Sequence, residues 1–139
     1  MSSERILIVE DDPVVMSVLQ SQLRTHGYEV VGAVSAAAAL EEAQTATPDL
    51  IILDVNLIDD DPFNSIRDGF GVLGWLRRTL PDATFPVVIH TVDDSPTIDV
   101  RARTNGVYGV VRKGADMNQL LAVVRRALDE WKGKATISN

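Results

Sequence analysis

Charged and polar side chains follow directly after several short apolar segments of this sequence. The acidic run at 10–12 (EDD) follows RILIV, and Asp54 and Asn56 follow LIIL. Thr91 ends a later apolar segment, and Lys113 comes just after another. If these segments are parallel strands, their carboxyl ends lie along one edge of a sheet, where the polar side chains converge. Carboxylates gathered there repel one another unless a divalent cation joins them, and oxygen ligands suit Mg²⁺ or Mn²⁺.

The remaining groups of this set suit an anionic ligand. The Lys113 ammonium and the Thr91 hydroxyl would complement the oxygens of an anion. A nucleophilic carboxylate such as Asp54, a metal, a lysine and a hydroxyl together form a phosphoryl-transfer site, where catalysis is mostly positioning and charge neutralisation. The residue types at the strand ends therefore predict phosphoryl transfer at this edge.

Apolar segments of strand length alternate with segments of helical periodicity along the chain. The near-continuous apolarity of most of these segments predicts strands that are buried on both faces of a parallel sheet. The second is more polar, as expected near an edge. The five expected strands are Arg5–Val9, Tyr28–Val34, Leu50–Leu53, Pro86–Ile89 and Val107–Val111.

Helical patterns fill the intervals between these strands. Pro13 suits a first helical turn, Gly27 should end that helix, and Ser35 is a plausible N-cap for the next. The segment 95–105 is polar and weakly periodic, so only a short, marginal helix is expected there. Five strands and five helices in alternation predict an α/β three-layer sandwich. The expected helices lie at 13–27, 35–45, 72–80, 95–105 and 117–128.

The composition indicates one soluble globular domain. The chain has 139 residues, of which 45% are hydrophobic and 24% charged, and we expect a domain at 1–132 with a frayed tail at 133–139. The net charge of -7 argues against nucleic-acid and membrane partners, because it repels phosphate backbones and anionic lipid. There is no cysteine, no signal peptide and no apolar run near the ~20 residues of a membrane helix. We therefore expect a cytoplasmic protein.

The chain resembles the receiver domain of two-component response regulators, in particular the single-domain, chemotaxis-regulator-like members, over nearly its whole length. The resemblance rests on ILIVEDDP, PDLIILDVNL, DGFGVLGWLR, VVIHT and GVVRKG, in this order. It implies a flavodoxin-like strand order, 2-1-3-4-5. It also implies a role for each matched residue. Asp54 would be the phospho-acceptor and a metal ligand, with Glu10 and Asp11 as the acidic metal pair and Asn56 as a further ligand through its backbone carbonyl. Thr91 would supply the hydroxyl that moves to the phosphoryl group on activation, and Lys113 would form an ion pair with the phosphoryl oxygens.

The resemblance also implies a function and partners. A histidine kinase or a phosphotransfer protein would donate a phosphoryl group to Asp54 with Mg²⁺ (or Mn²⁺) bound, which switches a surface that a downstream effector protein binds. Such a protein is not an enzyme, beyond catalysing its own phosphorylation and dephosphorylation. Exposed apolar surface on the last helix would suit a homodimer or a partner.

Several positions depart from the pattern of this family. The loop 58–67 beside the acceptor is longer than usual and could act as a flap, bind a partner or have no role. Val92 replaces a small residue and could slow hydrolysis of the aspartyl phosphate. Val110 replaces the switching aromatic, and strand alternation would put Tyr108 on the same face as Val110. Gly114 replaces a proline that is preceded by a cis bond, so a different loop is expected there.

Less specific interpretations remain for some polar residues. Asp12 should cap the first helix, and His90 should point away from Thr91 as a satisfied polar residue. The run 59–61 (DDD) is expected to be solvated, with a second cation site as the alternative.

Three other functions compete with phosphorylation-driven signalling. A haloacid-dehalogenase-type phosphatase needs an acid/base aspartate where Asn56 stands. A flavin carrier needs a phosphate-binding loop after the first strand, where the acidic run 10–12 would repel it. A receiver-like interaction module that works without phosphorylation stays open because of Val92, Val110 and Gly114.

Overall fold

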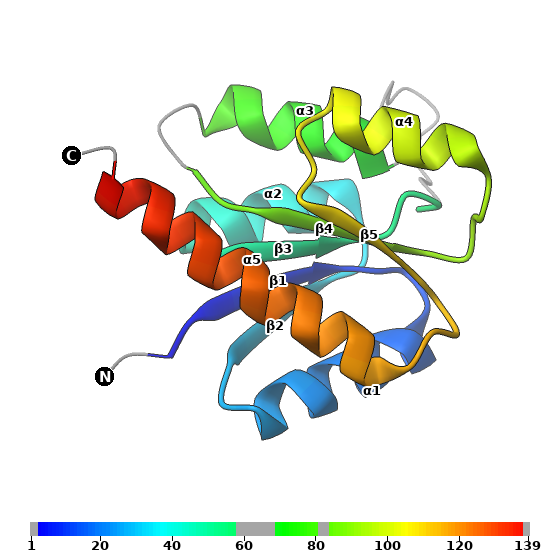
Figure 1. Cartoon of the computed structure of the whole chain (residues 1–139), viewed down its shortest axis with the longest axis horizontal. Helices are drawn as coiled ribbons and strands as arrows, with labels where there is room; N and C mark the ends of the chain where they lie inside the picture. The colour runs from blue at the N-terminus through cyan, green and yellow to red at the C-terminus, as the bar shows by residue number, and fades with distance from the viewer. Residues whose placement is uncertain (1–2, 58–68, 81–83, 138–139) are drawn as a thin grey trace.

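A five-stranded parallel sheet forms the centre of the molecule. The computed structural model describes residues 3–57, 69–80 and 84–137. The strands lie in the order β2-β1-β3-β4-β5, which confirms the predicted topology (Figure 1). They are nearly continuous runs of aliphatic residues because both faces of a helix-covered parallel sheet are buried. The strands are β1 (Arg5–Val9), β2 (Glu29–Ala33), β3 (Leu50–Leu53), β4 (Val87–Thr91) and β5 (Gly109–Arg112).

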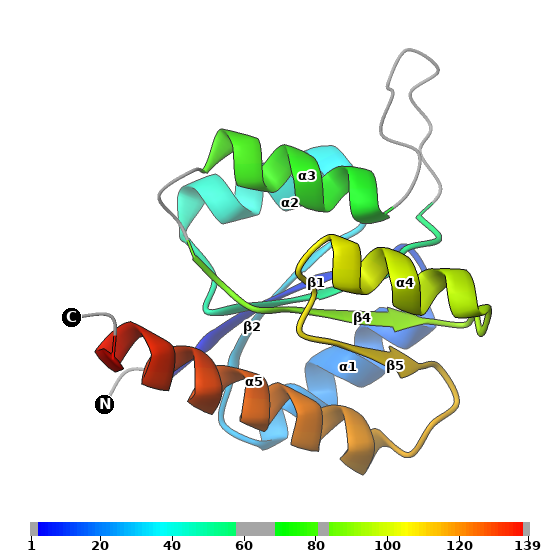
Figure 2. The same ribbon diagram turned by 45° about the horizontal axis from the view of Figure 1, so that its top comes forward.

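Five helices cover the two faces of the sheet. Figure 1 and Figure 2 show α1 and α5 on one face and α2, α3 and α4 on the other. One buried cluster therefore joins Ile6, Ile8 and Val88 to the first pair. The other joins Leu7 and Leu53 to the remaining three helices. The helices are α1 (Pro13–Thr25), α2 (Ala36–Thr45), α3 (Gly69–Thr79), α4 (Pro96–Thr104) and α5 (Met117–Ile137).

Local sequence signals set the boundaries of these helices. Asp12 is the N-cap of α1, where its side chain accepts hydrogen bonds from the N–H groups of Val14 and Val15. Ser35 caps α2 in the same way. Gly27 follows α1 with a φ of 90°, a conformation that glycine adopts without the steric cost of a Cβ. The predicted caps and the predicted end of α1 are thus confirmed.

Helix α5 extends further than its amphipathic pattern indicates. Its backbone is helical to Ile137, so it includes most of the segment 133–139 that we expected to be a tail. Fraying of that segment stays a prediction. Along the described part of the chain, no helix combines the length and the apolarity that crossing a membrane requires.

Candidate phosphoryl-acceptor site

The register of the sheet brings the polar strand ends together. Val9 of β1 is paired with Leu53 of β3, so the residues that follow them, Glu10 and Asp54, lie side by side. The N–H of Asp54 donates to the carbonyl of Val9 at 3.0 Å. On the other side of β4, the N–H of Lys113 donates to the carbonyl of Thr91 at 2.7 Å. Backbone hydrogen bonds therefore fix all four residues at one edge of the sheet.

Lys113 forms ion pairs with two buried carboxylates. Its Nζ lies 2.7 Å from Oε1 of Glu10 and 2.9 Å from Oδ2 of Asp54. Burial lowers the pKa of Lys113, but the hydrogen bonds with Glu10 and Asp54 outweigh it, so the pKa of the ammonium is raised overall. Lys113 is therefore a permanent cation at neutral pH.

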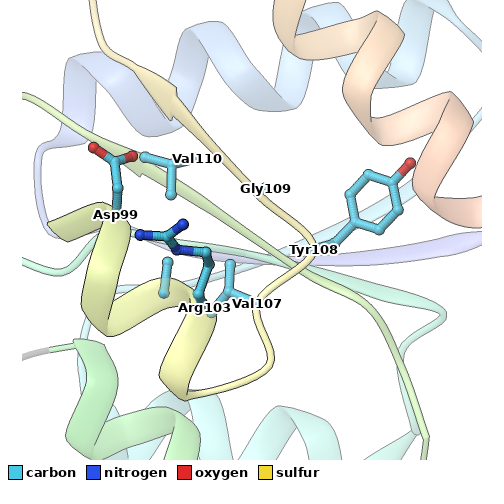
Figure 3. Close-up of a pocket in the computed structure, with 7 residues that line it drawn as sticks. Asp99, Arg103, Val107, Tyr108, Gly109 and Val110 are labelled. Atoms are coloured by element: carbon cyan, nitrogen blue, oxygen red, sulfur yellow. The ribbon is translucent and has the colours of Figure 1, made fainter. Parts of the chain in front are cut away.

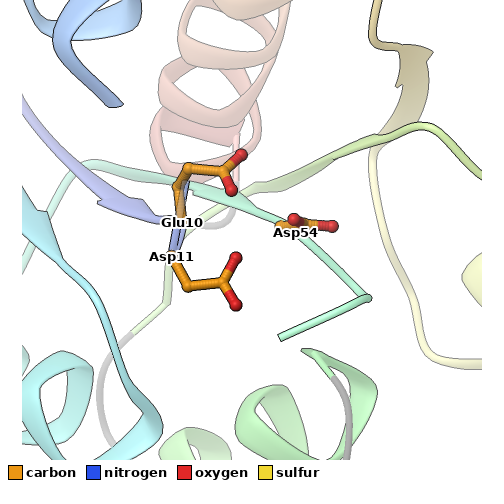
Figure 4. A group of neighbouring side chains, drawn as sticks. All are labelled: Glu10, Asp11 and Asp54. Carbon is orange, nitrogen blue, oxygen red and sulfur yellow. The ribbon is translucent and has the colours of Figure 1, made fainter. Parts of the chain in front are cut away.

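One ammonium does not balance the acidic groups at this edge. Carboxylate oxygens of Glu10, Asp11 and Asp54 all lie within 4.8 Å of one another (Figure 4). Burial, and then the charge of Asp54, raise the pKa of Glu10 despite its contact with Lys113. Three carboxylates and one lysine leave an excess of two negative charges when all are ionised. This oxygen-rich, electron-donating set fits a hard divalent cation such as Mg²⁺.

Asp12 does not join this cluster of carboxylates. Its side chain caps α1, as predicted, and its backbone N–H donates to Oε2 of Glu10 at 3.1 Å. The three consecutive acidic residues, 10–12, therefore have two different roles. Glu10 and Asp11 face Asp54, and Asp12 starts the helix.

Asn56 and Thr91 form a hydrogen-bonded pair beside Asp54. The backbone N–H of Asn56 donates to Oδ1 of Asp54 at 3.0 Å. Its side-chain Nδ2 donates to Oγ1 of Thr91 at 3.0 Å, and the N–H of Asp93 donates to the same oxygen at 3.2 Å. Thr91 is fully buried, at 0% exposure, whereas Asn56 is exposed. The structure therefore brings together all the residues predicted for the site.

The start of α3 packs tightly against the backbone of the acceptor. A Cβ on Gly69 would lie 2.4 Å from the carbonyl oxygen of Asp54 and 2.8 Å from Cα of Val55. The N–H of Gly69 also donates to the carbonyl of Val55 at 3.1 Å. Only a residue without a side chain permits this approach, which explains the glycine at this point.

His90 differs from its prediction. It lines a pocket with Val15 and Leu19 of α1, and strand alternation puts it on the other side of β4 from Thr91, as expected; it is only 8% exposed. Among the described residues, however, its buried Nδ1 has no hydrogen-bond partner, so it is not a satisfied polar residue. Burial, and then the charge of Lys113, lower the pKa of His90 to about 4, so the ring is neutral at pH 7. No signal in the sequence distinguishes a buried unpaired histidine from a paired one.

The prediction that Tyr108 shares a face with Val110 is wrong. Tyr108 packs with the cluster under α1 and α5, whereas Val110 packs with the cluster under α2, α3 and α4. The cause is that β5 begins only at Gly109, so strand alternation does not extend back to Tyr108. Val110, Asp99 and Arg103 line a hollow of about 330 Å³, and Figure 3 shows the ring of Tyr108 pointing away from these three residues.

The loop after Lys113 differs from the family pattern as expected. Gly114 has a φ of 93°, and the described residues contain no cis peptide bond. Val92, next to Thr91, is 68% exposed. The loop 58–67, with its acidic run 59–61, lies outside the described residues.

Comparison with known proteins identifies the class to which this fold and site belong. Residues 6–125 match the family model of the response regulator receiver domain. The chain belongs to this family, whose members are signalling domains that bind Mg²⁺ at an acidic pocket. The match favours a receiver over a haloacid-dehalogenase phosphatase or a flavin carrier.

Individual relatives include both single-domain and longer regulators. The chain is 32% identical to the transcriptional regulatory protein KdpE of Mycobacterium tuberculosis over 123 residues, 88% of this chain and 50% of that protein. It spans about half the length of such curated relatives. It is also 27% identical to protein PilH of Pseudomonas aeruginosa, with 89% of this chain and 97% of PilH aligned.

Solved structures show the same fold. A CheY-like receiver domain from Methanospirillum hungatei superposes with a TM-score of 0.83 at 25% identity, covering 96% of this chain and 99% of that one. The chemotaxis protein CheY4 of Vibrio cholerae superposes with a TM-score of 0.78 at 26% identity, covering 91% and 99%.

Proposed function

We propose that Asp54 accepts a phosphoryl group from a histidine kinase or a phosphotransfer protein and thereby switches a surface that a downstream effector binds. The observation that carries this proposal is the contact between Asp54 and Lys113 inside an acidic cluster at the carboxyl edge of the sheet. Residues 1–132 would form the working domain. Its setting would be the cytoplasm, without nucleic-acid or membrane partners.

The transfer makes one bond and breaks another. A carboxylate oxygen of Asp54 forms a bond to phosphorus while the phosphorus–nitrogen bond of a phosphohistidine donor breaks, and the released imidazole keeps the bonding pair and takes up a proton from water. The protein changes only its own state in this step. Its catalysis is limited to its own phosphorylation and, with water as the acceptor, its own dephosphorylation.

The metal would be held by the carboxylates of Glu10, Asp11 and Asp54 and by the backbone carbonyl of Asn56. When bound, Mg²⁺ supplies positive charge that neutralises the phosphoryl oxygens. Lys113 would supply a second positive charge, because its Nζ lies 2.9 Å from Oδ2 of Asp54. The carboxylates would otherwise repel an incoming phosphate, so both cations favour its approach.

The buried hydroxyl of Thr91 is the remaining polar group at the site. Its two acceptor positions are taken by Asn56 and Asp93, so its proton is available to a phosphoryl oxygen. A receiver-like module that works without phosphorylation is the second candidate, because Val110 is not aromatic and Tyr108 packs on the other face of the sheet.

Binding of beryllofluoride, which mimics a phosphoryl group on a carboxylate, tests the proposal. Fluorine NMR should show new bound resonances that need both Asp54 and Mg²⁺ and that vanish in Asp54→Asn. Asp129→Asn, the same substitution at an exposed position of α5, should keep them. Absence of bound resonances in the wild-type protein with excess Mg²⁺ would favour the phosphorylation-independent module.

A further inference from the structure

The hydroxyl of Thr91 is tied to the acceptor through a single residue. Asn56 holds Oδ1 of Asp54 with its backbone N–H and Oγ1 of Thr91 with its side-chain amide, each at 3.0 Å. The two bonds come from opposite ends of one short residue, which fixes the position of the hydroxyl relative to the carboxylate. Asn56 is an exposed residue, so its side chain is not required for filling the core.

The same hydroxyl is connected to the start of α4. The N–H of Asp93 donates to Oγ1 of Thr91 at 3.2 Å, and Oδ1 of Asp93 accepts from the N–H of Ser95 at 2.9 Å. Ser95 is the N-cap of α4, and its own side chain makes no capping hydrogen bond. Hydrogen bonds therefore connect Asp54 through Asn56, Thr91 and Asp93 to Ser95, the N-cap of α4.

This connection matters because the position on β5 where the family has a switching aromatic residue holds a valine here. Val110 stands at the corresponding point of β5, beside a surface hollow, and Tyr108 packs on the other face of the sheet. The hydrogen-bonded chain is a direct polar link between the carboxylate and the N-cap of α4.

We infer that the side-chain amide of Asn56 is a tether that holds Thr91, and with it the segment leading to α4, in the unphosphorylated position. The idea that Thr91 leaves this position on phosphorylation rests on the proposed function; the tether itself does not. A phosphoryl oxygen on Asp54 competes with the tether by accepting the proton of the Thr91 hydroxyl. Asn56 is thus a positioning residue that sets how readily the switch leaves its resting state.

Loss of the tether should be measurable without any phosphoryl group. A neutral hydrogen bond contributes about 0.5–1.5 kcal/mol, so its removal should raise the ratio of displaced to resting Thr91 roughly two- to tenfold. Asn56→Asp keeps the shape but cannot donate; its carboxylate would instead accept the Thr91 proton. That variant should hold Thr91 in place and weaken binding of a phosphoryl mimic.

Methyl NMR of the full chain labelled on threonine provides the test. Three-bond couplings from the Thr91 methyl carbon report its χ1 angle, and Thr91→Ser assigns the resonance. We expect the couplings of one dominant rotamer in the wild-type protein and in Asn56→Asp, and couplings shifted toward a second rotamer in Asn56→Ala. Asn118→Ala makes the same truncation at an exposed position of α5 and should leave Thr91 unchanged.

The outcomes separate the tether from the proposed function. Unchanged couplings in Asn56→Ala would overturn the tether, whether or not the protein takes up a phosphoryl group. Addition of Mg²⁺ and beryllofluoride to the wild-type protein should move the Thr91 resonance in the direction in which Asn56→Ala already moves it. A shift in the opposite direction would also overturn the tether. Failure of the wild-type protein to bind beryllofluoride would count against the proposed function and leave the coupling result standing.

Discussion

Nζ of Lys113 lies 2.9 Å from Oδ2 of Asp54, so the acceptor carboxylate is paired with a cation before any phosphoryl group arrives. Both side chains are largely buried, at 14% and 4% exposure. Buried charges are stable only when they are compensated. The lysine therefore stabilises the resting protein as well as the product of the transfer.

Replacing Lys113 should lower the stability of the metal-free protein. Lys113→Met leaves Asp54 and Glu10 without their shared cation, which should reduce the free energy of unfolding by about 3 kcal/mol. Mg²⁺ should restore most of this loss because it supplies the missing positive charge. Urea unfolding with Mg²⁺ and with a chelator measures both effects. Arg78→Met removes an exposed cation and serves as the control; an equal loss for Lys113→Met with and without Mg²⁺ would contradict this account.

A matched pair of glycines in α3 tests the close approach of this helix to the acceptor. In Gly69→Ala the new Cβ would meet the backbone of Asp54 and Val55, neither of which can move aside without disturbing β3. We expect a loss of about 1–3 kcal/mol, the usual cost of overpacking. Gly74→Ala meets nothing within 4 Å and should gain up to about 1 kcal/mol from helix propensity. Denaturant unfolding of the two variants should therefore show changes of opposite sign.

Because the pKa of His90 is lowered, the free energy of unfolding should fall as the pH is lowered. Its pKa is lowered from 6.5 to about 4 by burial, so the unfolded chain binds a proton between these values and the folded protein does not. The contribution is fully present above pH 6.5 and is lost as the pH falls toward 4. It amounts to about 2 kcal/mol between pH 7 and pH 5.

Comparison of the wild-type protein with a variant that lacks His90 isolates this contribution. Unfolding free energies of the wild-type protein and His90→Leu, measured from pH 7 to pH 5, should show a steeper fall for the wild-type protein. Parallel curves for the wild-type protein and His90→Leu would show that the histidine ring is protonated in the folded protein.

Val92 should lengthen the lifetime of the phosphorylated state. Its side chain is 68% exposed and directly follows the buried Thr91, a position from which it could limit the access of water. Val92→Ala should therefore lose its phosphoryl group severalfold faster, as measured by intact mass over time. Val100→Ala, on the exposed side of α4, is the control. An unchanged or longer lifetime in Val92→Ala would contradict this role.

The fold follows from the sequence where burial is uniform. Arg5–Val9 and Leu50–Leu53 were predicted with the bounds that β1 and β3 have, because a strand covered by helices on both faces is apolar throughout. The positions of Glu10 and Asp54 then follow from strand register alone. The site could therefore be assembled from residues that lie far apart in the sequence.

Other features depend on details that residue types do not determine. The predicted face of Tyr108 is wrong because the apolar run predicts a strand from Val107, whereas β5 begins two residues later, at Gly109. The bond between Asn56 and Thr91 depends on side-chain rotamers, and the unpaired Nδ1 of His90 depends on what surrounds it. The added length of α5 was missed because its last turns do not continue the apolar stripe.

The identity of the acceptor can be measured directly. The protein is incubated with Mg²⁺ and acetyl phosphate, and its intact mass is followed together with that of Asp54→Asn and Asp129→Asn. The account predicts the addition of one phosphoryl group, dependent on Mg²⁺, in the wild-type protein and Asp129→Asn, and none in Asp54→Asn. Phosphorylation that persists in Asp54→Asn, or no addition to the wild-type protein, would contradict the assignment of Asp54 as the phospho-acceptor.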